Sequence, residues 1–236
     1  MSVKTKKDQN LEEGYEYVDE GKTFRVKPLK CMNLRQKEFI RAIDSHEITF
    51  CTGPAGSGKS YLALWAALKA LTRGEFKQII LAKSVTPIPG EELGYAPGSI
   101  EEKMDPFIMS FTGNIDKLVG ERVRKKLMEQ GKIKVLPLAY IRGINIDESI
   151  VLLDEAQNLS ASVFKTIITR IGQCSKYIIT GDTEQIDLKN KKASVLSKVI
   201  DLFKDDELIG TIKFEEEDCV RNPIIPHILE KLKILE

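Results

Sequence analysis

One glycine-rich segment constrains the possible folds of this chain more than any other. It reads Gly53-Pro54-Ala55-Gly56-Ser57-Gly58-Lys59-Ser60 and matches the pattern G-x-x-x-x-G-K-[ST] at every position. A β-prone run precedes it and an Ala- and Leu-rich helical segment follows it. Glycines let consecutive backbone N–H groups turn inward around phosphate oxygens, and the start of the helix presents its free N–H groups to the same anion. A glycine-rich turn that merely ends in Lys-Ser is the alternative, which the full match and both flanks disfavour.

Short apolar runs alternate with helical segments along the rest of the chain. The apolar runs are 47–52, 78–82, 133–138, 150–154, 177–181 and 208–214, and the helical segments are 34–45, 59–73, 100–109, 116–130, 161–171, 193–203 and 224–235. Runs that are too apolar to alternate with polar residues indicate parallel strands that are buried on both faces. We therefore predict one α/β domain whose central, mainly parallel sheet is covered by helices on both faces.

Composition excludes several classes of protein. The 236 residues carry 36 Lys and Arg against 35 Asp and Glu, so net charge does not draw the chain to nucleic acid. Four cysteines without a CxxC pair, and only two histidines, argue against a zinc site or a disulfide framework. No apolar run reaches the roughly 18 residues of a membrane span, and the N-terminus lacks the apolar core of a secretory signal. We expect a cytoplasmic protein with no membrane partner.

The first thirty residues differ in composition from the remainder. They are more polar, and 15–18 and 23–26 can form a small hairpin, although a partly disordered arm is also consistent with them. We predict an N-terminal arm over 1–30 and the main domain over 31–236.

Acidic residues follow the apolar run at 150–154. Asp154 and Glu155 stand where the predicted strand ends, and the carboxyl ends of parallel strands are where ligands bind in open α/β sheets. With Lys59 neutralising the β- and γ-phosphates, we expect Ser60 and Asp154 to hold Mg²⁺ and Glu155 to activate water. An exposed acidic helix cap is the alternative for the two acids.

Two glutamines lie near the expected terminal phosphate. Gln157 and Gln185 are neutral amides that can orient water or detect the γ-phosphate without adding negative charge. Gln185 can also be an ordinary amide of a surface loop. Asp187 is expected to cap a turn or helix rather than to bind a metal ion.

Further segments occur in a characteristic order along the chain. They are 138–143 (Leu-Ala-Tyr-Ile-Arg-Gly), 153–158 (Leu-Asp-Glu-Ala-Gln-Asn), 169–172 (Thr-Arg-Ile-Gly), 179–182 (Ile-Thr-Gly-Asp) and 185–188 (Gln-Ile-Asp-Leu). Together with the phosphate loop they resemble the PhoH-like family of phosphate-starvation-inducible P-loop ATPases, which are related to the core of superfamily 1 helicases. The resemblance runs from about residue 33 to residue 226.

The resemblance implies a RecA-like P-loop NTPase domain that binds ATP and Mg²⁺ and has ATPase activity. It implies Gln36 as a reader of the adenine edge, and Arg221 as an arginine that stabilises the transferring phosphoryl group in cis or from a neighbouring subunit. A solvated helix position and a surface ion pair, respectively, are the alternatives. Lys83 stands where many relatives have arginine, which removes a planar fork for phosphate.

The sequence favours an Mg²⁺-dependent ATPase that hydrolyses the γ-phosphate of ATP. The alternative is a nucleotide-gated binding module with negligible turnover, and a small-molecule kinase fits less well. Coupling to RNA or single-stranded nucleic acid follows only from the resemblance, because the basic clusters at 6–7, 122–126 and 189–192 can equally be solvated faces. A homo-oligomeric ring, such as a hexamer, can supply a composite site and is a further hypothesis.

Overall fold

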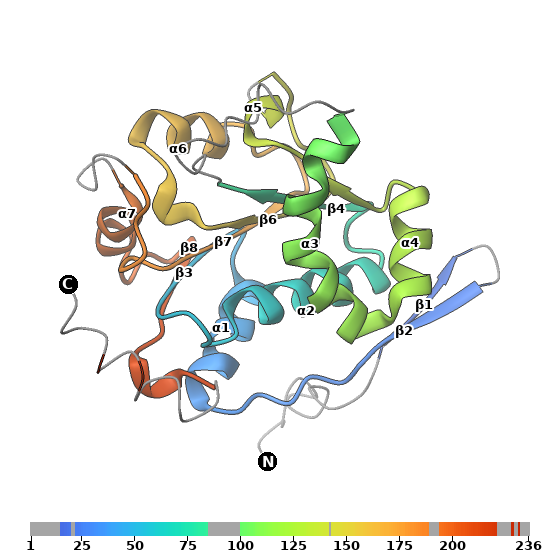
Figure 1. Ribbon diagram of the computed structural model, residues 1–236, viewed down its shortest axis with the longest axis horizontal. Helices are drawn as coiled ribbons and strands as arrows, with labels where there is room; N and C mark the ends of the chain where they lie inside the picture. Colours follow the sequence, from blue (N-terminus) through green and yellow to red (C-terminus); the bar gives the residue numbers. More distant parts are fainter. Residues whose placement is uncertain are drawn as a thin grey trace, which may run out of the picture.

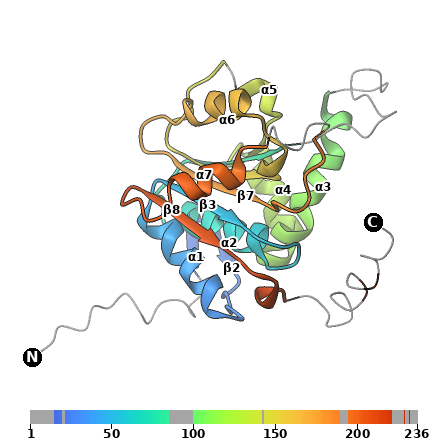
Figure 2. The same cartoon turned by 90° about the vertical axis from the view of Figure 1, so that its left-hand side faces the viewer.

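The computed structural model describes residues 15–19, 22–84, 100–141, 143–188 and 194–220, together with 228 and 231. Its centre is a six-stranded sheet in the order β5-β4-β6-β7-β3-β8, in which every pairing is parallel. The strands are β3 (Ile48–Thr52), β4 (Gln78–Lys83), β5 (Ile133–Val135), β6 (Ser149–Asp154), β7 (Lys176–Gly181) and β8 (Ile209–Lys213). Figure 2 shows β8 at one edge of this sheet, beside β3. The predicted parallel sheet is confirmed.

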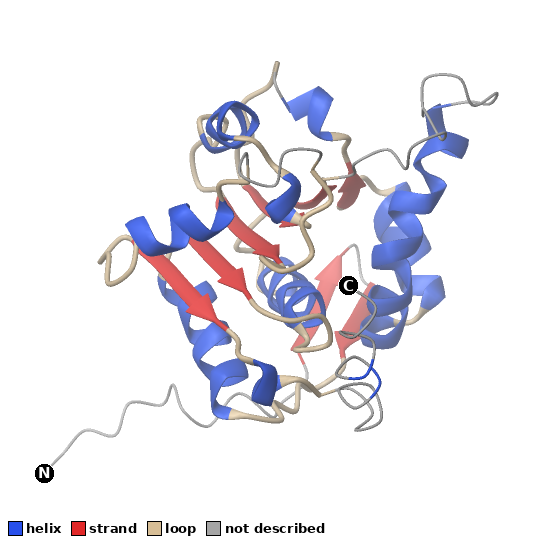
Figure 3. Cartoon of the chain, turned by 60° about the vertical axis from the view of Figure 1, so that its left-hand side comes forward, coloured by secondary structure: helices blue, strands red, loops and turns tan. Residues whose placement is uncertain are grey.

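Helices cover both faces of the sheet (Figures 1 and 3). They are α1 (Leu34–Ser45), α2 (Lys59–Thr72), α3 (Ile100–Val119) and α4 (Glu121–Glu129) on one side, and α5 (Leu138–Ile141), α6 (Ala161–Ile168) and α7 (Leu196–Leu202) on the other. Alternate residues of each strand join the two hydrophobic clusters: Leu152 and Ile178 pack towards α2, whereas Val151 and Ile179 pack towards α6 and α7. Both faces of the strands are therefore buried, which explains why their sequences are continuously apolar.

The small hairpin near the N-terminus is also confirmed. Strands β1 (Tyr15–Asp19) and β2 (Lys22–Val26) pair antiparallel. The chain that follows β2 packs on the domain: Val26 and Leu29 lie in the main core, and the Trp65 indole N–H donates to the Lys27 carbonyl at 2.9 Å. Trp65 is a buried core residue, as expected. The division between arm and domain at residue 31 stays a prediction.

The structure differs from the sequence-based boundaries at several places. The helix expected over 116–130 is divided at Gly120, whose φ of 85° breaks the helical path between α3 and α4. The strand expected over 133–138 ends at Val135, and Pro137 separates it from α5, which begins at Leu138. The helix expected over 161–171 ends at Ile168, and Ile171 forms a parallel bridge with Ile146 instead. Most of 224–235 lies outside the described residues.

No described helix has both the length and the apolar character that crossing a bilayer requires. The four cysteines lie in the described part of the chain and are free thiols.

Candidate nucleotide-binding site

The glycine-rich loop joins the end of β3 to the start of α2. Gly53 has a φ of 146°, and a Cβ on it would lie 2.5 Å from Phe214 Cβ, just beyond β8. Gly56 and Gly58 also have positive φ values, 92° and 89°. The loop therefore has a conformation that side chains at these positions would oppose. This is the strand–loop–helix arrangement that the sequence predicted for the phosphate site.

Lys59 is largely enclosed by the same loop, with 8% of its residue surface exposed. Its ammonium donates to the carbonyl oxygens of Gly53 at 2.6 Å and Pro54 at 2.9 Å, and Nζ lies 3.3 Å from Ser57 Oγ. The loop thus concentrates one positive charge at its own centre.

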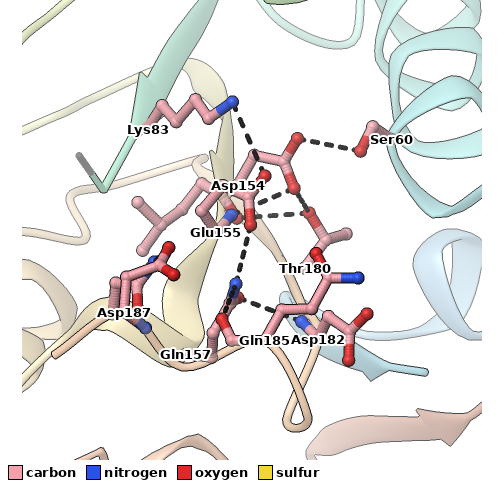
Figure 4. Close-up of polar contacts among 11 residues, drawn as sticks. Ser60, Lys83, Asp154, Glu155, Gln157, Thr180, Asp182, Gln185 and Asp187 are labelled. Carbon is pink, nitrogen blue, oxygen red and sulfur yellow. Dashed lines mark hydrogen bonds and ion pairs between the residues drawn. The ribbon is translucent and has the colours of Figure 1, made fainter. Parts of the chain in front are cut away.

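Ser60 and Asp154 meet although they are 94 positions apart in the sequence. The Ser60 hydroxyl donates to Asp154 Oδ2 at 2.8 Å, and the Thr180 hydroxyl from β7 donates to Asp154 Oδ1 at 2.6 Å. The Glu155 backbone N–H also donates to Oδ1, at 3.0 Å. Figure 4 shows these groups converging from α2, β6 and β7. A hydroxyl and a carboxylate at this separation are hard oxygen ligands of the kind Mg²⁺ prefers.

The described residues contain no group of three or more His, Cys, Asp or Glu that could bind a metal ion alone. A magnesium ion at Ser60 and Asp154 therefore needs further oxygen ligands. This agrees with the usual protein site for Mg²⁺, in which one or two protein ligands are joined by phosphate oxygens and waters.

Glu155 directly follows β6 in a left-handed backbone conformation with φ 56°. Its Oε2 accepts a hydrogen bond from Gln157 Nε2 at 2.7 Å, and its Oε1 lies 3.5 Å from the ammonium of Lys83. Lys83 ends β4, the neighbouring strand, and points towards Glu155 in Figure 4.

Gln157 connects the ends of β6 and β7. It is 1% exposed, its Nε2 also donates to the Gln185 carbonyl at 3.0 Å, and its Oε1 accepts from the Asp182 N–H at 3.0 Å. Gly181 permits this contact, because a Cβ there would lie 2.7 Å from Gln157 Oε1. Gln157 therefore fixes the loop after β7 relative to Glu155.

The backbone carbonyl of Gln185 accepts a hydrogen bond from Gln157, and Gln185 also borders the cleft. Asp187 pairs with Asn158: the Asn158 amide donates to the Asp187 carboxylate at 3.1 Å, and the Asp187 N–H donates back at 2.8 Å. Asp187 thus holds the loop after β7, in agreement with the structural role that the sequence suggested. These hydrogen bonds are with Asn158 and not with Ser60 or Asp154.

The glycine-rich loop borders one cleft of about 710 Å³ together with Asp154, Glu155 and Gln185. Its other walls come from residues 29–32, from Gln36, and from Asn114 and Lys117 on α3. Leu29, Met32 and Val220 provide apolar surface. The volume is in the range of about 300–1,000 Å³ that small-molecule sites occupy.

Comparison with known proteins identifies the family. The model of the PhoH-like protein family matches residues 28–233. The chain belongs to the PhoH-like family. PhoH-like proteins of Bacillus subtilis and Synechocystis are 39% and 38% identical to it over 210 residues, or 89% of this chain, and Protein PhoH of Escherichia coli K12 is 34% identical over 204 residues, or 86%. The chain spans 64% of the length of the first two relatives and 57% of the third.

A solved structure shares the same fold. The large terminase of a thermophilic bacteriophage superposes with a TM-score of 0.50 and 10% identity, over 84% of this chain and 50% of that chain. The fold and the family together make this PhoH-like chain a P-loop NTPase domain, as predicted.

Gln36 has a structural role in this PhoH-like domain that the sequence did not predict. It is buried, its Oε1 accepts from the Met32 N–H at 2.7 Å, and its Nε2 donates to the Ser57 carbonyl at 3.0 Å. Its own N–H donates to Oδ1 of Asn33, the N-cap of α1, at 2.9 Å. The amide therefore ties the phosphate loop to the segment before α1. Its contact with adenine stays a prediction.

Arg221 lies outside the described residues, as does Arg142. The segment that precedes Arg221 contacts the phosphate loop: the Val220 N–H donates to the Gly56 carbonyl at 3.0 Å, and Cys219 Sγ lies 3.5 Å from the Ala55 carbonyl.

Two site residues were missed by the sequence analysis. Thr180 holds Asp154, and Lys83 contacts Glu155. Both stand at the carboxyl ends of predicted strands, and this position could have marked them as candidate site residues. Which strand ends are neighbours depends on strand order, which the sequence does not show.

Burial suppresses ionisation of two groups close to the phosphate loop. It raises the pKa of Cys51, which is fully buried in β3, well above its ordinary value, and the opposing effect of the Lys59 charge is smaller. Burial also raises the pKa of Tyr61, which lines the cleft. Both groups therefore stay protonated near neutral pH, and Cys51 is a packing residue, not a nucleophile.

Proposed function

We propose that this PhoH-like domain binds ATP together with Mg²⁺ and hydrolyses the γ-phosphate. The observation that carries the proposal is the Ser60–Asp154 hydrogen bond of 2.8 Å at the start of α2, with Glu155 next in the chain. A phosphate-binding loop, two magnesium ligands and a carboxylate base thereby share one cleft.

The phosphate loop binds the triphosphate through its backbone N–H groups and through Lys59. Phosphate oxygens compete with the carbonyls of Gly53 and Pro54 for the Lys59 ammonium. To bind phosphate, the ammonium exchanges its hydrogen bonds to these two carbonyls for bonds to phosphate oxygens. A charge-assisted bond to an anion is stronger than one to a neutral carbonyl, so the exchange favours nucleotide binding.

Ser60 and Asp154 would hold the magnesium ion between them. Both offer oxygen, and Thr180 and the Glu155 N–H fix the orientation of the Asp154 carboxylate. When bound, the ion neutralises negative charge on the phosphates during transfer.

Glu155 then accepts a proton from the attacking water while the water oxygen bonds to the γ-phosphorus and ADP departs with the bridging oxygen. Gln157 holds the Glu155 carboxylate, and Gln185 borders the cleft where its amide can contact the water or the γ-phosphate. Arg221 directly follows Val220, whose N–H bonds to the phosphate loop, which supports a role for the Arg221 guanidinium at the transferring phosphate. Gln36 can read adenine if its amide exchanges the Met32 contact for the base edge.

Two variants test the hydrolase proposal. Lys59→Ala should abolish nucleotide binding or turnover, and Glu155→Gln should bind ATP and retain it uncleaved. Arg35→Ala is a matched control, because Arg35 forms an exposed ion pair with Glu38 on α1, and it should hydrolyse ATP like the parent. If Lys59→Ala and Glu155→Gln both hydrolyse ATP at the parental rate, the assignment is wrong.

A nucleotide-gated binding module with negligible turnover is the second candidate. The contact of Lys83 with Glu155 favours it, because the ammonium holds the carboxylate that hydrolysis needs. ATP hydrolysis measured with and without single-stranded RNA and DNA, on size-fractionated protein, separates the two candidates. It also tests polymer coupling and a homo-oligomeric ring such as a hexamer.

The basic residues of α4 give polymer binding little support. Arg124 forms a 2.7 Å ion pair with Asp116, and Lys125 forms one of 2.7 Å with Glu121. Two members of this cluster are therefore neutralised within the domain. Residues 6–7 and 189–192 lie outside the described residues.

A further inference from the structure

Both carboxylate oxygens of Glu155 have partners. Oε2 accepts from Gln157 at 2.7 Å, and Oε1 faces the Lys83 ammonium at 3.5 Å. The side chains of Lys83 and Glu155 are 24% and 35% exposed, so the pair is partly shielded from solvent. A carboxylate has about four lone-pair sites, and a hydrogen bond on one oxygen with an ammonium near the other fixes the direction in which the remaining sites point.

Lys83 approaches Glu155 from outside the nucleotide cleft. Asp154, Glu155 and Gln185 border the cleft, whereas Lys83 is not among its lining residues. In Figure 4, Lys83 extends from β4 on the side of Glu155 opposite to Gln157. The ammonium therefore contacts the carboxylate from a residue that does not itself line the cleft.

The backbone at Lys83 is fixed by the sheet, and its ammonium is carried on a flexible side chain. Lys83 is in register with Asp154 across β4 and β6. The next residue, Ser84, donates its N–H to the Asp154 carbonyl at 3.0 Å and its hydroxyl to the Asn158 carbonyl at 3.1 Å. A flexible four-carbon stem thus carries a charge from a rigid anchor, and the ion pair can open without any movement of the sheet.

We propose that Lys83 is a positioning residue that restrains Glu155. Its ammonium holds the carboxylate in a resting orientation, and opening of this ion pair releases Glu155 to accept the proton from water. The inference rests on the proposed ATPase function and adds a control of the same site by a residue outside the nucleotide-binding motifs.

The test compares Lys83→Met with Lys83→Arg in the full chain. Methionine keeps an apolar stem and removes the charge, whereas arginine keeps the charge. Lys77→Met is the matched control, because Lys77 precedes the same strand and pairs with Glu148 at the opposite end of it. We measure kcat and KM for Mg²⁺-ATP and the unfolding temperature of each variant. Each substitution at position 83 is also made in a Glu155→Gln background.

Lys83→Met should raise kcat about three- to fivefold, as expected for loss of a partly exposed ion pair, and leave KM unchanged. Lys83→Arg and Lys77→Met should retain the parental kcat. In the Glu155→Gln background, where no turnover is expected, Lys83→Met should leave the unfolding temperature unchanged, because the amide carries no charge to hold. A merely structural role would lower the unfolding temperature but would not produce this split between kcat and KM or the rescue by arginine.

The proposal is overturned if Lys83→Met lowers kcat or leaves it unchanged, or if it shifts the unfolding temperature equally in the parental and Glu155→Gln backgrounds. Those results leave the ATPase function intact, provided that the parent hydrolyses ATP. If the parent is inactive and Lys83→Met hydrolyses ATP, the restraint is supported. If neither hydrolyses ATP, the proposed function fails and the restraint fails with it.

Discussion

The two ends of the parallel sheet differ in how their buried polar groups are paired. At the carboxyl end, Asp154 and Gln157 each take part in three side-chain hydrogen bonds or more, which join α2, β6 and β7. At the amino end, Tyr177 Oη and Arg170 Nε are buried with no hydrogen-bond partner among the described residues. Leaving a buried polar atom unpaired costs about 1–3 kcal/mol. The carboxyl end therefore has a defined polar geometry, which chemistry requires, whereas the amino end leaves two polar atoms unpaired beside the paired hydroxyls of Ser149 and Ser175.

The largest effect should come from the charge at the carboxyl end of the sheet. Asp154→Asn keeps an oxygen that can accept from Thr180 but removes the negative charge that would bind Mg²⁺ beside Ser60. We expect ATP turnover to fall about 100- to 1,000-fold, which is typical for losing one electrostatic element of a catalytic site. A magnesium titration of turnover measures the change. An unchanged magnesium dependence would remove Asp154 from the metal site.

The next effect should come from the backbone of the phosphate loop. Gly53→Ala places a Cβ 2.5 Å from Phe214 Cβ and 2.6 Å from its carbonyl oxygen, at a φ of 146°. We expect about 2–4 kcal/mol less stability, from overpacking and backbone strain, together with weaker ATP binding. Urea unfolding and ATP titration report the two effects. Gly113→Ala is the control, because nothing lies within 4 Å of a Cβ at that helical position; equal losses in both variants would contradict the account.

A smaller effect should follow from opening the Gln157 network. Gln157→Leu has a similar size but leaves the Asp182 N–H and the Gln185 carbonyl without their present partner. We expect a loss of about 1–3 kcal/mol of stability and about tenfold in turnover, because Glu155 also loses its hydrogen bond. Denaturation and kcat measure these values. A variant with parental kcat would show that this contact does not serve hydrolysis.

The smallest effect at neutral pH should occur at the opposite end of the sheet. Tyr177→Phe removes a buried hydroxyl that has no partner among the described residues, so stability at pH 7 should rise by about 1 kcal/mol and turnover should not change. A tenfold loss of turnover here would abolish the contrast between the two ends.

The pH dependence of Tyr177 sharpens the same contrast. Burial raises the pKa of Tyr177 to about 12, and the nearby charge of Arg170 opposes this only in part. The folded-state pKa lies above the unfolded value of 10.0, so the contribution of the phenol to stability is complete below pH 10 and is lost as pH rises from 10 to about 12. Unfolding free energies at pH 9 and pH 11 should therefore differ less in Tyr177→Phe than in the parent.

The sequence predicted the phosphate loop because its function depends on contiguous residues and on backbone conformation. It also predicted the six strands, because short, continuously apolar runs between helical segments are typical of strands in a buried parallel sheet. The contact of Ser60 with Asp154 could be expected from a shared ligand, and the structure brings them together.

The remaining contacts depend on strand order, which no local pattern encodes. Lys83 meets Glu155 because β4 lies next to β6, and Thr180 reaches Asp154 because β7 lies on the other side of β6. The engagement of Gln36 with both Met32 and Ser57 likewise depends on how α1 approaches the phosphate loop. The assignments of Gln36, Gln157, Gln185 and Arg221 to nucleotide chemistry stay predictions.

The place of β7 between β3 and β6 has a mechanical consequence. The strand of the phosphate loop and the strand of the carboxylates do not pair with each other, but both are in register with β7, through Thr52 opposite Gly181 and Leu153 opposite Ile179. Adjacent strands are about 4.8 Å apart, so the outer two are separated by roughly twice that distance. A longitudinal slip of this middle strand would shift the glycine-rich loop and the Asp154–Glu155 segment at the same time, so the positions of the two halves of the cleft are mechanically coupled.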